Sequence, residues 1–175
     1  MKLFLEMFLW TLEKAETVRF FHLQTDITES PRDPDAVMKD QMELLGMING
    51  KGARYAHSTS WRYEDGRTLL TYLVWVHGHE LENLPTRQLF IPSVTCPTSR
   101  GPLSPRPESI CEAHVLVHGL RHLRYLALDQ EDVVAAELLE CRQTCIFLHS
   151  LEPALSGRFE TQPTTVVEDV QVATL

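Results

Sequence analysis

An Asp-Gly pair at residues 65 and 66 separates two runs that are rich in β-branched and aromatic side chains, 53–64 and 67–76. Both central residues of the favoured two-residue hairpin turn take positive φ, a conformation that Asp and Gly tolerate better than most residues do. The pair therefore predicts an antiparallel β-hairpin over residues 53–76. This hairpin commits the middle of the chain to a β-sheet.

A two-residue loop also fixes which residues of the hairpin lie opposite each other. Glu64 is then opposite Arg67, and Thr59 is opposite Tyr72. We expect the face with the larger side chains to be the core face. Its members are Tyr55, His57, Thr59, Trp61, Tyr63, Leu70, Tyr72 and Val74. The opposite face holds Arg62 among the small side chains of the first run.

The N-terminal part of the chain predicts two further strands, because apolar side chains occupy both alternation phases in Lys2–Leu12 and again in Thr17–Ile27. A helix over residues 3–12 stays open as the alternative. After a loop rich in Pro and Asp, Asp35 stands at the N-cap position of an amphipathic helix over residues 36–48.

Six of the ten prolines lie between the hairpin and Ser109. We expect a short edge strand at residues 89–91 and a loop over residues 93–109. Two helices are predicted next, over residues 110–128 and 129–151, because N-cap residues precede each helical pattern.

This order of elements predicts a single α+β domain over residues 1–152, with an antiparallel sheet that helices cover and with a C-terminal helix pair. The sheet-rich part spans residues 1–92, the loop spans 93–109, and the helix pair spans 110–151. Residues 153–175 form a C-terminal tail.

Composition limits the classes of protein to which the chain can belong. With 43% hydrophobic and 23% charged residues, the 175-residue chain has the balance of an ordinary globular domain. The formal net charge of −8 provides no long-range attraction to a phosphate backbone, so we expect no nucleic-acid partner. Residues 51–125 are nevertheless net positive, which leaves room for a local pocket that binds a small anion.

The N-terminal segment imitates a signal peptide, in which a basic residue precedes an apolar run. Glu6 interrupts the run and no small-residue cleavage pattern follows, so we expect this segment to belong to the folded protein. No stretch approaches the ~20 apolar residues of a membrane-spanning helix, and we expect no membrane partner. The four cysteines form no dense disulfide framework, which favours a reducing, cytoplasmic location.

Three histidines with four-residue spacing, His114, His118 and His122, mark the predicted helix 110–128. At about 100° per residue they share one flank with Arg121 and Tyr125, whereas apolar side chains gather on the other flank. We therefore expect the His-bearing flank to face away from the core. It is then a solvated surface, a subunit contact or a binding site.

Helical histidines one turn apart can share a metal ion. His118 would do so with His114 or with His122. The outer two histidines lie about 12 Å apart along the helix axis, which is too far for one tetrahedral ion. A divalent metal on two of these histidines is the basis of the alternative function, a metal-dependent enzyme.

Cys141, Cys145 and His149 repeat the four-residue spacing on the second predicted helix. The two cysteines fall on the side of the apolar residues, so we expect them to act as small buried hydrophobic side chains. A metal site here would require the two helical stripes to face each other, which the sequence leaves open.

The site that we favour binds an anion in the net-positive part of the chain, because paired Arg hydrogen bonds suit a carboxylate or a phosphate. The residues expected to form it are His118, Arg121, His122 and Tyr125 of the helix and Arg62 of the hairpin. We expect a binding or regulatory module whose partner is a small anionic ligand or a protein, a second copy of the chain included. Whether the protein is also an enzyme is left open.

Overall fold

The computed structural model describes residues 2–47, 53–98, 107, 109–129, 138 and 141–154. The strands in these ranges are β1 (Lys2–Lys14), β2 (Thr17–Asp26), β3 (Ala53–Glu64), β4 (Arg67–Val76) and β5 (Arg87–Phe90). The helices are α1 (Pro34–Leu44), α2 (Glu112–Arg124) and α4 (Arg142–Ser150), and a π-helical turn at Tyr125–Asp129 follows α2. Short 3-10 turns lie at Gly78–Leu81 and Ile91–Ser93. The predicted α+β class is confirmed.

The five strands form a mixed sheet in the order β3-β4-β1-β2-β5. Neighbouring strands are antiparallel except for β1 and β4, which run parallel. The prediction of a purely antiparallel sheet is therefore wrong. The hairpin of β3 and β4 joins the sheet with its second arm beside β1, and this arm runs in the direction of β1. Parallel pairing suits β1 because it is covered on both faces.

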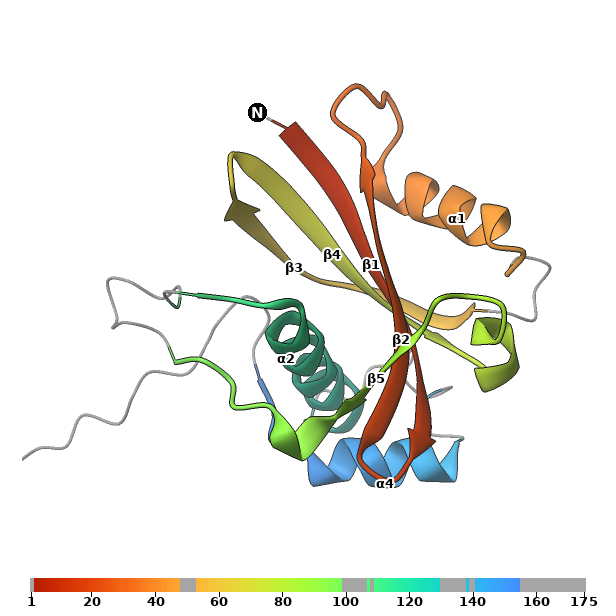
Figure 1. The fold of residues 1–175 in the computed structure, drawn as a ribbon, viewed down its shortest axis with the longest axis vertical. Coiled ribbons are helices and arrows are strands. Elements are labelled where there is room, and N and C mark those ends of the chain that lie inside the picture. The colour runs from red at the N-terminus through yellow and green to blue at the C-terminus, as the bar shows by residue number, and fades with distance from the viewer. Residues whose placement is uncertain are drawn as a thin grey trace, which may run out of the picture.

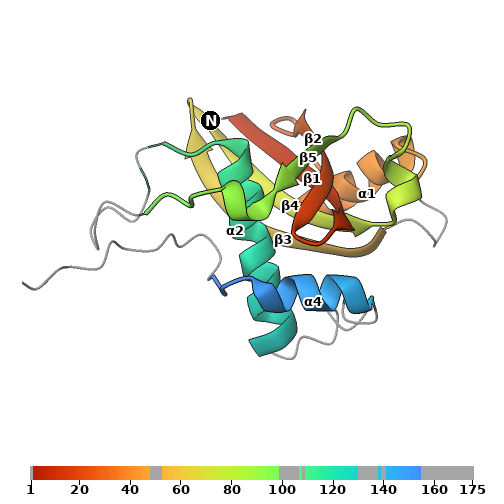
Figure 2. The ribbon, with the colours of Figure 1, turned by 60° about the horizontal axis from the view of Figure 1, so that its bottom comes forward.

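The central strand β1 contributes side chains to two separate cores. Phe8 and Trp10 belong to the core beneath α2 and α4, whereas Met7 and Leu9 belong to the core beneath α1. All four side chains are fully buried. Figures 1 and 2 show α1 on one side of the sheet and α2 with α4 on the other. The predicted N-terminal strands are thus confirmed, and the alternative of a helix over residues 3–12 is wrong.

The turn at Asp65-Gly66 sets the hairpin register as predicted for the pairs closest to it. A β-bulge at Thr59 then shifts the pairing, so that Ser58 rather than Thr59 lies opposite Tyr72. The register predicted beyond the bulge is wrong. Because one extra residue reverses the alternation of a strand, the side chains of β3 on the far side of the bulge lie on the face opposite to the expected one.

The bulge also changes which side chains of the hairpin are in a core. Tyr55 lies with Leu73 and Trp75 in the core beneath α2, while Trp61 and Tyr63 are 70% and 52% exposed. The expected division into one aromatic core face and one outer face is therefore wrong. Helices cover parts of both faces of the sheet, so each face needs apolar side chains.

The first turn of α1 is fixed to the sheet by Asp35. The N-cap of α1 is Asp33, whose side chain accepts a hydrogen bond from the Ala36 N–H, and not Asp35 as predicted. Asp35 instead accepts a hydrogen bond from the Tyr72 hydroxyl of β4. Burial, the hydrogen bond to Asp35 and the charge of Asp35 raise the pKa of Tyr72 above its ordinary value.

On the other face of the sheet, α2 approaches the strands closely at Gly119. A β-carbon at this position would lie 2.6 Å from Leu73 Cδ1 and 3.6 Å from Thr59 Cγ2. Glycine therefore permits a helix-to-sheet contact that a larger residue would obstruct. The helix α2 also packs against α4, which lies across it (Figure 2).

The structure describes the C-terminal half of the prediction only in part. The predicted helix 110–128 is confirmed by α2 and its π-helical turn. The prediction of one continuous helix over residues 129–151 is wrong, because α4 begins only at Arg142, after Cys141 with an extended backbone as its N-cap, and residues 130–137, 139 and 140 lie outside the described ranges. Most of the loop 93–109 and of the tail 153–175 falls outside the described ranges. Within those ranges no helix has the length and apolar character needed to cross a membrane.

Candidate functional site

Both flanks of α2 contain buried side chains, contrary to the expectation that the His-bearing flank faces away from the core. His118 and His122 are only 6% and 7% exposed. The ring of His122 lies 5.6 Å, centroid to centroid, from that of His57 of β3. The chain after α4 covers the same flank, because the Ala154 N–H donates to the Arg121 carbonyl at 3.2 Å. A polar flank tolerates this burial when its polar groups find partners.

His122 is a packing residue in this arrangement. Its Nδ1 lies 3.1 Å from the carbonyl oxygen of Ala154, which can only accept, so Nδ1 carries the proton. Burial lowers the pKa of His122 below its ordinary value, and the hydrogen bond to Ala154 offsets this effect only in part. Tyr125 stacks on His122 with ring centroids 6.2 Å apart. The neutral ring therefore provides no positive charge for a ligand at neutral pH.

The part of the chain that the structure describes contains no group of three or more His, Cys, Asp or Glu side chains placed to hold a metal ion. His114 Nδ1 accepts a hydrogen bond from the Cys111 N–H at 3.2 Å and completes the N-terminal cap of α2. Cys141 is the N-cap of α4 and packs against the core, while Cys145 and His149, on α4 itself, are half-buried and exposed. Metal binding by pairs of the three helical histidines stays a prediction.

Arg62 belongs to a buried polar network on the sheet. Its guanidinium pairs with both carboxylate oxygens of Glu6, and Nη2 lies 2.8 Å from Oε1. Glu6 also accepts hydrogen bonds from Thr71 at 2.8 Å and from Gln24 at 3.0 Å, and its Oε1 lies 3.0 Å from His22 Nε2. The Glu6 carboxylate is 1% exposed. A charge buried this deeply requires such a complete set of partners.

The same network reaches the first residue of α2. His22 Nδ1 lies 3.2 Å from the Glu112 carboxylate, with which Arg87 of β5 also pairs. Near Arg121, His122 lies beside His57 of β3, and Arg62 is five residues further along that strand, about 16 Å away at about 3.3 Å per residue. The structure therefore does not bring Arg62 and Arg121 together in one site.

The electrostatics of Glu6 indicate a structural role for the network. Burial by itself would raise the pKa of Glu6, but hydrogen bonds to Arg62, His22 and Thr71 and the charge of Arg62 outweigh burial and hold the pKa well below its ordinary value. A carboxylate with so many donors has little capacity left to accept a proton or a ligand group. We therefore assign the network to holding strands β1 to β4 and the start of α2 together.

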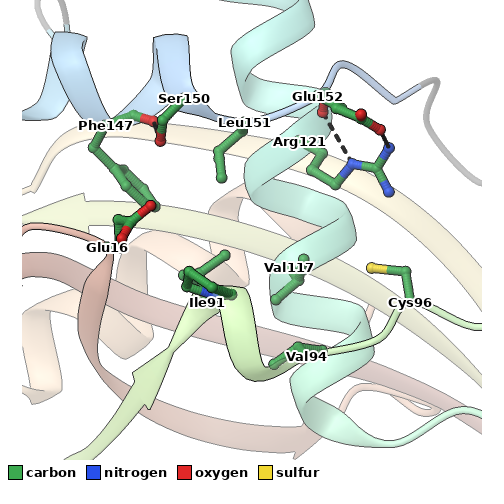
Figure 3. A pocket seen from close by; sticks show the side chains of 11 residues that line it. Glu16, Ile91, Val94, Cys96, Val117, Arg121, Phe147, Ser150, Leu151 and Glu152 are labelled. Carbon is green, nitrogen blue, oxygen red and sulfur yellow. Dashed lines mark hydrogen bonds and ion pairs between the residues drawn. The ribbon is translucent and has the colours of Figure 1, made fainter.

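A cavity of about 520 Å³ lies between the β1–β2 turn, the segment after β5, α2 and α4 (Figure 3). Six of its eleven lining residues are apolar: Ile91, Pro92, Val94, Val117, Phe147 and Leu151. The other lining residues are Glu16, Cys96, Arg121, Ser150 and Glu152. Small-molecule sites typically have volumes in this range and combine apolar walls with a few polar groups.

Arg121 is the predicted site residue that lines this cavity. Its side chain is 11% exposed, and Nε donates to the Glu152 carbonyl at 2.9 Å. The Glu152 carboxylate is 3.5 Å from Nη2 and 86% exposed, so this ion pair is long and weak. The backbone contact orients the guanidinium, while the carboxylate contact is one that an incoming anion can replace.

Comparisons of this chain with protein-family models, with curated proteins and with solved structures found no match. Function therefore has to be inferred from the geometry of the site. We take the cavity that Arg121 lines, rather than the polar network, as the candidate site. The cavity has space for a ligand, whereas the polar groups of the network are already hydrogen-bonded to one another.

Two groups of residues in these sites are absent from the sequence-based prediction. Glu6 interrupts an apolar strand, and His22 and Gln24 alternate on β2, so strand periodicity contains a signal for the network. The cavity has no comparable signal, because its lining comes from segments that are far apart in the sequence.

Proposed function

We propose that the protein is a binding module for a small molecule with an apolar body and an anionic group. The observation that supports this function is the position of Arg121, a largely buried guanidinium at a cavity that six apolar residues help to line. The apolar body would displace water from the wall, and the anionic group would replace the exposed Glu152 carboxylate beside Arg121.

The residues predicted for the anion site have different roles in this proposal. Arg121 contacts the anionic group of the ligand. His118, His122 and Tyr125 support the α2 flank from which Arg121 projects. Arg62 acts in the buried network on the sheet and has no part in ligand contact.

Octanoate and its neutral counterpart octanamide test the proposal, because the two probes share a chain length and differ in charge. We expect octanoate to bind the protein more tightly than octanamide in isothermal titration calorimetry. A hydrogen bond to a charged group contributes about 1.5–3 kcal/mol. Arg121→Gln should therefore weaken octanoate binding by roughly ten- to hundredfold and leave octanamide binding nearly unchanged.

Arg124→Gln is the matched control, because Arg124 is on the same helix and is not part of the cavity wall. This variant should bind octanoate as the unmodified protein does. Val94→Phe places a larger side chain in the cavity wall and should weaken the binding of both probes. Equal octanoate affinity in the protein with and without Arg121, or unchanged binding by the Val94 variant, would contradict the proposal.

A further inference from the structure

Glu16 lines the cavity from the turn between β1 and β2, and Figure 3 shows it with Phe147 on the side away from Arg121. Its backbone has a φ of 62°, a left-handed conformation that is uncommon for residues other than Gly, Asn and Asp. The Ile91 N–H donates to the Glu16 carbonyl at 2.9 Å and fixes the turn against another residue of the wall. Asp65 in the turn between β3 and β4 has the same conformation, with a φ of 48°, so the positive φ of Glu16 is what a tight hairpin turn requires.

The carboxylate of Glu16 is engaged by no hydrogen bond or ion pair from the residues that the structure describes. Glu13, at the end of β1, differs in this respect because it pairs with Arg19 at 2.8 Å. The turn thus holds a carboxylate at the cavity without giving it a protein partner. Its charge is available to a group that enters the cavity.

Among the residues that the structure describes, the charged groups that line the cavity do not balance one another. Glu16 and Glu152 supply two negative charges, and Arg121 supplies one positive charge. A ligand whose only charge is negative is attracted by Arg121 and repelled by Glu16. A ligand with an ammonium group at its other end is attracted by both Arg121 and Glu16. The cavity therefore binds such a ligand more tightly than one whose only charge is negative.

We infer that the ligand is an amino carboxylate with an apolar spacer, whose anionic group contacts Arg121 and whose ammonium group contacts Glu16. This inference rests on the proposed function, because it takes Arg121 as the anion contact. It adds an ammonium group to the ligand. It also gives the ligand an orientation, from Arg121 past Ile91 and Leu151 to Glu16 (Figure 3).

A series of ω-amino carboxylates, from 4-aminobutanoate to 8-aminooctanoate, tests the inference when each is compared with the alkanoate and the alkylamine of the same length. Dissociation constants come from calorimetry or from NMR titration of the full chain. We expect a preferred length at which the amino carboxylate binds roughly two- to fivefold more tightly than the alkanoate, the effect of an exposed ion pair.

Glu16→Gln should remove this gain and leave alkanoate affinity unchanged or higher, because the repulsion is also removed. Glu13→Gln, on the same hairpin, is the matched control and should keep the gain. Alkanoate binding that an amino group weakens at every length, or a gain that survives Glu16→Gln, would overturn the inference and leave the proposed function standing.

Two further outcomes separate this inference from the function on which it rests. If neither alkanoates nor amino carboxylates bind, the proposed function fails and the inference fails with it. If alkylamines bind most tightly and Arg121→Gln has no effect on any probe, the cavity is a cation site and both are overturned.

Discussion

Glu6 and Arg62 are charged residues whose side chains are only 1% and 14% exposed. Burying these charges costs free energy that their ion pair must offset. Glu6→Gln would remove the buried counter-ion of Arg62 and leave only the longer ion pair with the more exposed Glu64. Removing one partner of a buried pair costs about 3–5 kcal/mol, and we expect the free energy of unfolding in urea to fall by this amount at neutral pH. Glu64→Gln, which removes the outer contact of Arg62, should cost less than about 1 kcal/mol.

The lowered pKa of Glu6 also predicts how this contribution depends on pH. The folded protein holds the Glu6 proton less tightly than the unfolded chain, whose ordinary pKa is 4.5. The contribution is therefore fully present above the unfolded pKa and is lost as the pH falls toward the folded pKa. In urea titrations, the stability difference between the unmodified protein and Glu6→Gln should be constant above about pH 5.5 and shrink below it. An undiminished difference at about pH 3 would show that another group causes it.

His122 also predicts a loss of stability on acidification, in a higher pH range than Glu6 does. Its folded pKa is lowered from 6.5 by burial, so the unfolded chain binds more protons just below that pH. The free energy of unfolding should therefore fall as the pH drops from about 6.5 toward the folded pKa. His122→Gln should reduce this slope in urea titrations between about pH 5 and pH 7, whereas His149→Gln, at an exposed position, should not. Equal slopes in all three proteins would exclude His122 as the source.

Arg121 and His122 show that a residue pattern can predict a helix without predicting which of its flanks is buried. The helical wheel places Arg121 and His122 on one flank, and the helix it assumes is confirmed. Whether that flank is buried depends on β3 and on residues 152–154, which cover it. Periodicity describes one element and contains no information on which distant segment packs against it.

Among the elements, the approach of α2 to the sheet depends on the missing side chain of Gly119. Gly119→Ala adds a β-carbon 2.6 Å from Leu73 Cδ1. Overpacking costs about 1–3 kcal/mol, and the better helix propensity of Ala returns about 1 kcal/mol. We expect this variant to lose stability by roughly 1 kcal/mol in urea titrations.

Leu73→Ala provides the background that separates these two effects. When the Leu73 side chain is shortened, the overpacking disappears and the propensity gain of about 1 kcal/mol remains. Gly119→Ala should therefore stabilise the Leu73→Ala protein while it destabilises the unmodified one. An effect of the same sign and size in both backgrounds would show that the close contact does not limit the packing of α2.

The elements also differ in how far local sequence determines them. The Asp65-Gly66 turn specifies its hairpin because the required φ angles are a property of the two residues themselves. The bulge at Thr59 has no such local cause. The Thr59 hydroxyl donates to the Thr71 carbonyl at 3.3 Å, and its methyl group lies under Gly119, so the bulge depends on contacts with β4 and α2.

For the whole molecule, the parallel pair of β1 and β4 is the feature that the sequence leaves undetermined. The apolar side chains of β1 in both alternation phases predict burial on both faces, and this is observed. They do not determine which strands become neighbours, because any strand with a similar pattern can pair there. The order β3-β4-β1-β2-β5 places the second arm of the hairpin beside β1, a neighbour that the residue pattern of β1 does not specify.

The position of β1 between the two cores predicts that both unfold together, as expected of one domain. Met42 is 1% exposed in the core beneath α1, whereas Trp10 and Trp75 lie in the core beneath α2. Met42→Ala should lower the free energy of unfolding by about 2–5 kcal/mol. The transition seen by tryptophan fluorescence should then shift to lower urea by as much as the transition seen by circular dichroism.

A Trp61→Phe background removes the signal of the exposed tryptophan and leaves fluorescence that reports only on the core beneath α2. In that background, coincident midpoints for both probes mean that loss of packing beneath α1 destabilises the opposite core through the strand they share. If the fluorescence midpoint stays in place while the circular dichroism midpoint moves, the cores unfold separately. Residues 1–152 would then comprise more than one cooperative unit, since Met7 and Trp10 of the same strand would lose their packing in different steps.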